Sequence, residues 1–367
     1  MDPTRRLARI SVRPPACQEP DRTSRTSSAE LARPARRVAG ESVWAATSSE
    51  SRPGGELDDR SKESRDPSGP TKQRGGRRVA ELVVGDFVAD RYRIVRALAH
   101  GGMARVYFAE DVRLERPVVV KYGVGVEAPY LRREARVLAN LDDVLIPPVF
   151  DVGDVGAEGA FLVMPWIPAD NLRDVIATTG PWSALDAAEL GLALARAVAH
   201  VHARGIVHCD LKPSNVLVRD DPARRIALVD FGVADNVEPP ITRLARTGKI
   251  LGTPCFLPPE NLRGGVPTQR TDVYGLGACL YYALSGVPPV EPREQLAELL
   301  VAVMEGRVVP LRARRPGMPA ELAELVHRAL SPDPDARFAD AIELAEALRK
   351  VHHRLRLTHG SGIVASR

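Results

Sequence analysis

The sequence has no long apolar run and is poor in aromatic residues. Aromatic residues make up 5% of the 367 residues, whereas hydrophobic residues make up 44% and charged residues 27%. No stretch approaches the ~18–20 apolar residues that a helix needs to cross a bilayer, so we expect no membrane span. The first residues, Met-Asp-Pro-Thr-Arg-Arg, do not lead into an apolar segment, so we also expect no secretory signal.

Cysteine is scarce as well. The four cysteines are Cys17, Cys209, Cys255 and Cys279, and no two of them form a Cys-x-x-Cys pair. This pattern excludes a disulfide scaffold and a zinc knuckle. It is typical of proteins in a reducing compartment, and we expect a cytoplasmic location.

The first 80 residues differ from the rest of the chain in charge and composition. They contain 17 Lys and Arg against 11 Asp and Glu, and 30 Ser, Thr, Pro and Gly against 10 large apolar residues. Because such a segment cannot bury enough apolar surface to offset its ordering entropy, we predict a disordered basic arm over residues 1–80. The arm is either a docking segment for an acidic partner or a solvated leader without a fixed role. The lack of aromatic residues among its arginines favours the leader, and the net charge of +4 for the whole chain does not favour a nucleic-acid partner.

From residue 91 onward the sequence shows the period of strands and then that of helices. Apolar or alternating runs predict strands over residues 92–98, 106–108, 117–121 and 161–164. Helical spacing predicts helices over residues 130–141, 185–203, 272–284 and 320–330. Strands followed by helices indicate an α+β protein with two lobes.

The strongest chemical signal lies in two short segments, His208-Cys209-Asp210-Leu211-Lys212-Pro213-Ser214-Asn215 and Leu228-Val229-Asp230-Phe231-Gly232. Both segments flank short apolar strands. Asn215 and Asp230 offer the hard oxygen ligands that Mg²⁺ prefers. Asp210 is placed to accept a proton from an incoming hydroxyl. Lys212 is placed to neutralise charge on a moving phosphoryl group.

These two segments resemble the catalytic loop and the metal loop of protein kinases. Residues 252–260 resemble the end of the kinase activation segment, and residues 271–277 resemble the central helix that follows it. Residues 333–337 resemble a motif near the end of the kinase domain, whose arginine, here Arg337, pairs with Glu260. The sequence Lys212-Pro213-Ser214-Asn215 resembles the form found in the serine/threonine kinases. Residues 101–103 read Gly-Gly-Met, as in the eukaryotic-like kinases of bacteria.

The resemblance spans about residues 91–353 and implies a bilobal, protein-kinase-like fold. It places a small β-rich N-lobe at residues 91–165 and a larger helical C-lobe at residues 168–353. Residues 354–367 are left as a short C-terminal tail.

The resemblance also assigns a site for ATP. Lys121 matches the lysine that holds the nucleotide phosphates, and Glu134 is its best partner. The spacing of 13 residues between them is short for the family and predicts a trimmed helix or leading loop. Glu127 is the alternative partner but lies too close to the strand. The remaining expected nucleotide contacts, in the phosphate-covering loop, the adenine pocket, the gatekeeper and the hinge, are Leu98, Ala99, Gly101, Gly102, Val106, Val119, Met164, Pro165, Ile167 and Leu217.

The chain departs from the family pattern at several positions. Ala99 and Ala104 replace two of the three expected loop glycines, which are needed where backbone approaches phosphate oxygens. Cys209 occupies the place of the arginine that reaches a phosphorylated activation-loop residue. That charge pair cannot form here, although Thr242 and Thr247 lie beside basic residues. Cys209 is either a small apolar filler or a redox-sensitive thiol, and the absence of an adjacent base favours the filler.

The resemblance therefore predicts an ATP- and Mg²⁺-dependent serine/threonine protein kinase in bacterial signalling, with Mn²⁺ as an alternative metal. Its protein substrates cannot be read from the sequence. The alternative is a pseudokinase scaffold that binds nucleotide with little or no transfer. The degraded glycine loop, the trimmed helix and the missing arginine favour the scaffold, whereas the intact set of catalytic, metal and phosphate residues opposes it. A small-molecule phosphotransferase would share the fold but should lack residues 252–260.

Overall fold

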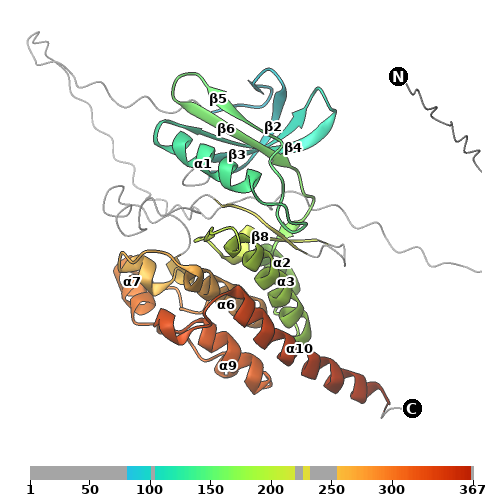
Figure 1. Cartoon of the computed structure of the whole chain (residues 1–367), viewed down its shortest axis with the longest axis vertical. Coiled ribbons are helices and arrows are strands. Elements are labelled where there is room, and N and C mark those ends of the chain that lie inside the picture. The colour runs from blue at the N-terminus through green and yellow to red at the C-terminus, as the bar shows by residue number, and fades with distance from the viewer. Residues whose placement is uncertain (1–80, 101–103, 220–225, 232–253, 365–367) are drawn as a thin grey trace, which may run out of the picture. The chain divides into compact units, whose positions relative to one another are not determined.

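The computed structural model describes residues 81–100, 104–219, 226–231 and 254–364 (Figure 1). The predicted arm over residues 1–80 lies outside these residues. In the described part, the chain first builds an antiparallel sheet of six strands and then a mainly helical region with a small second sheet.

The six-stranded sheet has the spatial order β1-β2-β3-β4-β6-β5, with every neighbouring pair antiparallel. Its strands are β1 (Phe87–Val88), β2 (Tyr92–His100), β3 (Arg105–Asp111), β4 (Arg116–Val124), β5 (Asp151–Val155) and β6 (Gly159–Pro165). The 3₁₀ helix η1 (Gly125–Glu127) joins β4 to helix α1 (Ala128–Ala139), which packs on β4 and β6. A connection this short holds the first turn of α1 close to the end of β4.

Strand β4 is buried on both faces of this sheet. Val118, Val119 and Val120 are all completely inaccessible to solvent. Val118 and Val120 belong to one apolar cluster with Tyr107, whereas Val119 belongs to the larger core that includes α1. A continuous apolar run is what a strand covered on both faces requires.

The helical region begins after β6. Its larger helices are α2 (Leu172–Thr179), α3 (Ala184–His202), α6 (Gln269–Ser285), α7 (Leu296–Met304), α9 (Ala320–Ala329) and α10 (Ala341–Val364). The short helices are α5 (Pro259–Leu262), α8 (Leu311–Arg314), η2 (Pro213–Asn215), η4 (Pro254–Phe256) and η5 (Pro334–Ala336). The second sheet consists of β7 (Asp170–Asn171), β8 (Val216–Val218) and β9 (Ile226–Leu228).

Local sequence signals fix the ends of the main helices. The Ser183 hydroxyl accepts a hydrogen bond from the Asp186 N–H at 3.1 Å and so caps α3. Thr268 and Thr271 form a capping box at the start of α6. Gly286, with φ of 76°, ends α6 in the left-handed conformation that favours glycine.

Helices α3, α6 and α10 pack against one another and form the centre of the helical core. Gly191 of α3 faces Leu280 of α6 and Leu348 of α10. A Cβ atom at position 191 would lie 2.8 Å from Leu280 Cδ2, so only glycine allows this close approach.

The structure confirms the α+β, two-lobed architecture, and all eight strands and helices expected from the pattern are present with ends shifted by up to three residues. Two boundaries differ from the sequence expectation. Strand β1 pairs with β2 although it precedes residue 91. Helix α10 continues through the expected tail to Val364, because Val351 and Leu355 extend its buried face.

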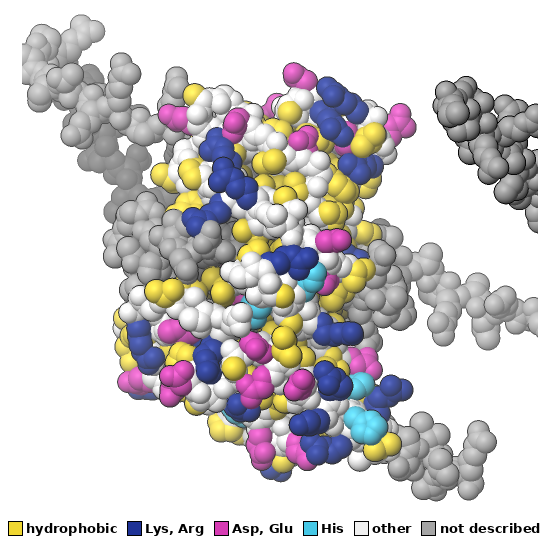
Figure 2. Space-filling model, viewed as in Figure 1, with side chains coloured by type: hydrophobic (Ala, Val, Ile, Leu, Met, Phe, Trp, Pro, Cys, Tyr) yellow, Lys and Arg dark blue, Asp and Glu magenta, His cyan; other side chains and the backbone are white. Residues whose placement is uncertain are grey.

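The exposed surface of the helical region carries both signs of charge. In the face shown in Figure 2, basic and acidic side chains are interspersed over the described helices. Ion pairs such as Arg354–Glu321, at 2.8 Å, and Arg328–Glu343, at 2.9 Å, are part of this pattern. Among the described residues, none of the helices is long and apolar enough to traverse a bilayer.

We expect His327 of α9 to make the free energy of unfolding depend on pH. Its Nε2 atom accepts a hydrogen bond from the Leu311 N–H at 2.8 Å, and burial lowers the pKa of His327 below its ordinary value. The unfolded chain then binds more protons than the folded chain as the pH falls below about 6.5. The free energy of unfolding should therefore be greatest above about pH 6.5 and decrease as the pH falls below it.

His327→Gln tests this expectation, since a glutamine oxygen can accept the same hydrogen bond but does not titrate. Urea unfolding should be measured at about pH 7.5 and about pH 5.5. The variant should lose less stability than the parent between these two conditions. Equal losses in the two proteins would contradict the role of His327.

Candidate active site

The loop that precedes η2 carries the first group of expected site residues. Asp272, in the first turn of α6, is buried and holds this loop by its carboxylate. The backbone N–H groups of His208 and Cys209 each donate to it at 2.8 Å. His202 Nε2 lies 2.9 Å from the same carboxylate. Asp272 therefore fixes the backbone immediately before Asp210.

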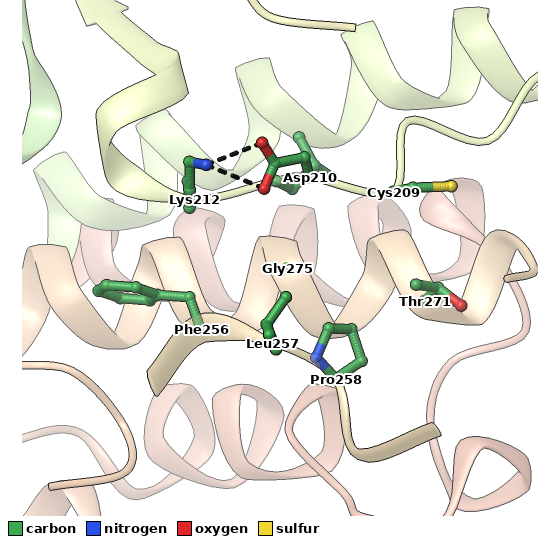
Figure 3. Close-up of a pocket in the computed structure, with 9 residues that line it drawn as sticks. Cys209, Asp210, Lys212, Phe256, Leu257, Pro258, Thr271 and Gly275 are labelled. Carbon is green, nitrogen blue, oxygen red and sulfur yellow. Dashed lines mark hydrogen bonds and ion pairs between the residues drawn. The ribbon is translucent and has the colours of Figure 1, made fainter. Parts of the chain in front are cut away.

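Asp210 accepts hydrogen bonds from two other expected site residues. Lys212 Nζ donates to both Asp210 carboxylate oxygens, at 3.0 and 2.8 Å (Figure 3). The Asn215 side-chain amide donates to the Asp210 carbonyl at 2.9 Å and to its carboxylate at 3.1 Å. The structure thus brings Asp210, Lys212 and Asn215 together, and it holds the Asp210 carboxylate in one orientation.

A hollow lies beside Asp210 and Lys212. Figure 3 shows these two side chains on one side of it and Phe256, Leu257 and Pro258 on the other. Gly275 of α6 lines it as well. A Cβ atom at position 275 would lie 2.5 Å from Leu211 Cβ, so the glycine lets α6 press directly against the loop.

Lys121 of β4 forms the second polar centre. Its ammonium lies 2.5 Å from Glu134 Oε1 on α1 and 2.5 Å from Asp230 Oδ1 after β9. The side chains of Lys121 and Glu134 are only 4% and 3% exposed. Burial alone would lower the pKa of Lys121, but the carboxylates of Asp230 and Glu134 raise it above the ordinary value. The predicted pair of Lys121 and Glu134 is thus present in the structure.

The two carboxylates around Lys121 respond differently. Burial opposes ionisation of Asp230, but the adjacent Lys121 cation holds its pKa below the usual value, and Lys212 acts in the same direction. For Glu134, burial outweighs Lys121 and raises the pKa. Because the Lys212 charge acts on Asp230, the two polar centres belong to one electrostatic site.

His208 connects these centres through packing. Its ring lies 4.4 Å from that of Phe231, the residue after Asp230. Both side chains are buried, and burial lowers the pKa of His208. The neutral imidazole packs on Phe231 and accepts a hydrogen bond at Nδ1 from the Asp210 backbone N–H at 3.3 Å.

Asn215 and Asp230 fit the expected Mg²⁺ in their chemistry. Both supply oxygen atoms, and Mg²⁺ usually takes one or two carboxylates plus phosphate oxygens rather than a complete protein cage. The Asn215 amide nitrogen donates to Asp210, so its side-chain carbonyl oxygen, which accepts a hydrogen bond from the Ser214 hydroxyl at 3.4 Å, is the atom that can bind a metal ion. Among the described residues, no cluster of three or more His, Cys, Asp or Glu could hold a metal by itself.

The expected adenine contacts fall into two apolar groups. Leu98, Val106, Val119 and Met164 contribute to one cluster on the sheet side. Leu217 and Ile167 belong to a separate small cluster that also contains Ala227 of β9. Pro165 ends β6, and Ala99 lies in β2. Gly101 and Gly102 lie outside the described residues, so the phosphate-covering loop stays a sequence-based prediction.

Arg337 and Glu260 form the ion pair that the late motif predicted. Arg337 donates to both Glu260 oxygens at 2.7 Å. The Arg337 side chain is completely buried, and its guanidinium lies 4.9 Å from the Tyr274 ring centroid. This bidentate pair anchors α5 to η5.

The role of Asp272 was missed by the sequence analysis, although its segment was noted. An acid at the start of an otherwise apolar, buried helix was the available signal.

Cys209 is buried with φ of 67°, and its thiol lies 3.4 Å from the Val207 carbonyl. Cys255 and Cys279 are also buried, and burial raises the pKa of both thiols.

Comparison with known proteins places this site in a family. A family model described as "Protein kinase domain" matches residues 92–352. The chain is 33% identical over 275 residues to serine/threonine-protein kinase PknB of Mycobacterium tuberculosis, covering 72% of this chain and 44% of that protein. It is 29% identical to serine/threonine-protein kinase PrkC of Bacillus subtilis, covering 72% and 41%. The chain thus spans less than half the length of these relatives.

A solved structure shares the fold. The crystal structure of Rad53 1-466 in complex with AMP-PNP superposes with a TM-score of 0.59 at 21% identity, over 70% of this chain and 64% of that one. At this identity the likeness concerns the fold alone.

Glu134→Gln should destabilise the protein, because it removes one of the two carboxylates around a buried ammonium. Asp230 still compensates Lys121, so we expect a loss of about 1–3 kcal/mol, below the ~3–5 kcal/mol of a fully orphaned buried charge. Urea unfolding measures the difference.

Glu127→Gln is the matched control. Glu127 lies half-buried in η1, one step before α1, and its replacement should change stability by no more than about 0.5 kcal/mol. A larger loss from Glu127→Gln than from Glu134→Gln would show that Lys121 is paired differently in solution.

Proposed function

Because this chain belongs to the protein kinase family, we propose that it transfers the γ-phosphoryl group of ATP to serine and threonine hydroxyls of proteins. The observation that carries the proposal is the Asp210 carboxylate, held by Lys212 and Asn215 beside a hollow lined by Phe256 and Leu257. The names of the bacterial relatives, which are serine/threonine-protein kinases, support the same acceptor class.

Catalysis would consist of positioning and electrostatic stabilisation. Asp210 orients the acceptor hydroxyl and takes its proton. Lys212, 2.8 Å from Asp210, stabilises charge on the transferring group. Lys121, braced by Glu134, binds the nucleotide phosphates.

The proposed cofactors are ATP and Mg²⁺, with Mn²⁺ as an alternative metal. Asn215 and Asp230 would hold the metal ion, which when bound neutralises charge on the phosphates. Asp230 already carries the required negative charge, since the adjacent Lys121 holds the pKa of its carboxyl below the usual value.

The protein substrates belong to this proposal only as a class, proteins with an accessible serine or threonine. A role in bacterial signalling is proposed because the relatives are serine/threonine-protein kinases of bacteria. The cytoplasmic location and an acidic partner for residues 1–80 stay predictions from the sequence.

Asp210→Asn tests the proposed activity. Loss of the base should lower phosphoryl transfer by roughly 10²–10⁴ while nucleotide binding persists. The assay is incorporation of labelled phosphate into a generic protein acceptor with Mg²⁺ and ATP, alongside calorimetric binding of a non-hydrolysable ATP analogue.

Asp142→Asn is the control, because Asp142 is an exposed acid in the loop after α1. It should match the parent in both measurements. A parent that binds nucleotide without measurable transfer would instead support the pseudokinase scaffold. Equal transfer by Asp210→Asn and the parent would refute the catalytic assignment.

Transfer should also be largely independent of phosphorylation at Thr242 and Thr247, which lie outside the described residues. A new phosphate of charge about −2 biases a loop only where a cation receives it, and the neutral Cys209 precedes Asp210. A Thr242→Ala, Thr247→Ala double variant should therefore keep its activity on a peptide acceptor to within about tenfold, which is ~1.4 kcal/mol of barrier. A larger loss would show that another basic group receives the phosphate.

A further inference from the structure

A row of four side chains crosses the large sheet from β2 to β6. Arg96 is the Cα partner of Phe108, Phe108 of Val119, and Val119 of Met164. Directly opposed residues in neighbouring strands point to the same face of a sheet. Arg96 and Phe108 therefore extend the row of Val119 and Met164, the expected adenine roof and gatekeeper, toward the outer strands.

Trp166 contacts this row at Phe108 and Arg96. It lies two residues after Met164, in the hinge segment formed by residues 165–167. Its ring is in edge contact with Phe108, with centroids 4.9 Å apart and planes at 71°. The Arg96 guanidinium lies 5.4 Å from the Phe108 centroid and 5.9 Å from the Trp166 centroid. Arg96, Phe108 and Trp166 thus form one cation–aromatic cluster, here termed the hinge brace.

The hinge brace joins three segments that serve two parts of the proposed nucleotide site. Arg96 lies on β2 and Phe108 on β3, the two strands that flank residues 101–103 of the expected phosphate-covering loop. Trp166 belongs to the segment expected to bind adenine by its backbone. A contact among these segments links the hinge directly to β2 and β3.

The three side chains lie at the margin of the apolar core. All are half-buried, and Trp166 packs against the core that contains Met164. Aromatic pairs and cation–π contacts stabilise such sites modestly and depend on geometry. Their loss should loosen the hinge more than it destabilises the whole domain.

We propose that Arg96, Phe108 and Trp166 are positioning residues for the nucleotide, which set ATP affinity by bracing the hinge against the β2–β3 hairpin. This inference rests on the proposed kinase function. The brace acts on binding, because none of its members belongs to the group around Asp210 that acts on the acceptor hydroxyl. Its removal should therefore raise the KM for ATP and leave kcat nearly unchanged.

The variants that test this role are Arg96→Met, which keeps the apolar stem, and Phe108→Leu, which keeps apolar volume. Each should raise the Kd of a Mg²⁺-bound, non-hydrolysable ATP analogue and the KM for ATP about three- to tenfold, with kcat within about twofold. The double variant should lose less than the product of the single effects, since both remove one cluster.

Arg93→Met is the matched control. Arg93 lies on the same strand as Arg96, is exposed and pairs with Glu110 instead of an aromatic ring. It should leave Kd, KM and kcat as in the parent. Amide hydrogen exchange, measured without nucleotide, provides a readout independent of activity. Residues 166 and 167 should exchange faster in Phe108→Leu than in Arg93→Met.

The outcomes separate the two proposals. Unchanged Kd and hinge exchange in Arg96→Met and Phe108→Leu, in a parent that binds nucleotide, would overturn the brace. So would losses of affinity that merely follow a fall in melting temperature, or equal changes in kcat. A parent that binds no nucleotide refutes the kinase proposal, and with it the effect on ATP, whereas faster hinge exchange would still support the mechanical contact.

Discussion

The arrangement of the site depends on the buried ammonium of Lys121. Its cation lies between Glu134 on α1 and Asp230 after β9, at 2.5 Å from each. Removing an ammonium from water costs several kcal/mol unless carboxylates and hydrogen bonds compensate it. Compensation here requires β4, α1 and the segment after β9 to be in place together. The short connection through η1 reduces the positions open to α1, so the same charge that would bind phosphate also determines how the sheet and the helical region meet.

Two further buried charges act in the helical region by the same principle. Asp272 accepts two backbone N–H groups at 2.8 Å and contacts His202. Arg337 forms a bidentate pair with Glu260. Each charge takes its partners from segments distant in sequence, so a displaced loop would leave a buried charge unpaired. Apolar packing supplies most of the stability of such a core, whereas these polar groups select one arrangement of the loops around Asp210.

The parts of the site that sequence could predict are those encoded locally. Asp210, Lys212 and Asn215 lie within six residues, and Lys121 and Glu134 are linked by a strand followed directly by a helix. The partners of Asp272 and Trp166 depend on tertiary contacts. Strand β2 also has register shifts between Ile94 and Arg96 and between Ala97 and Ala99. A bulge breaks the alternation on which facing is inferred, so the sequence pattern could not place Arg96 opposite Phe108.

The backbone conformation at position 209 is held by a contact that does not involve the Cys209 side chain. Cys209 and Asp230 have φ of 67° and 65°, in the left-handed region that costs non-glycine residues about 1–2 kcal/mol. At Cys209 the conformation is held by its own N–H group, which donates to Asp272. That hydrogen bond is the same for any side chain at this position. The backbone before Asp210 is therefore held by Asp272 and does not depend on which side chain stands at position 209.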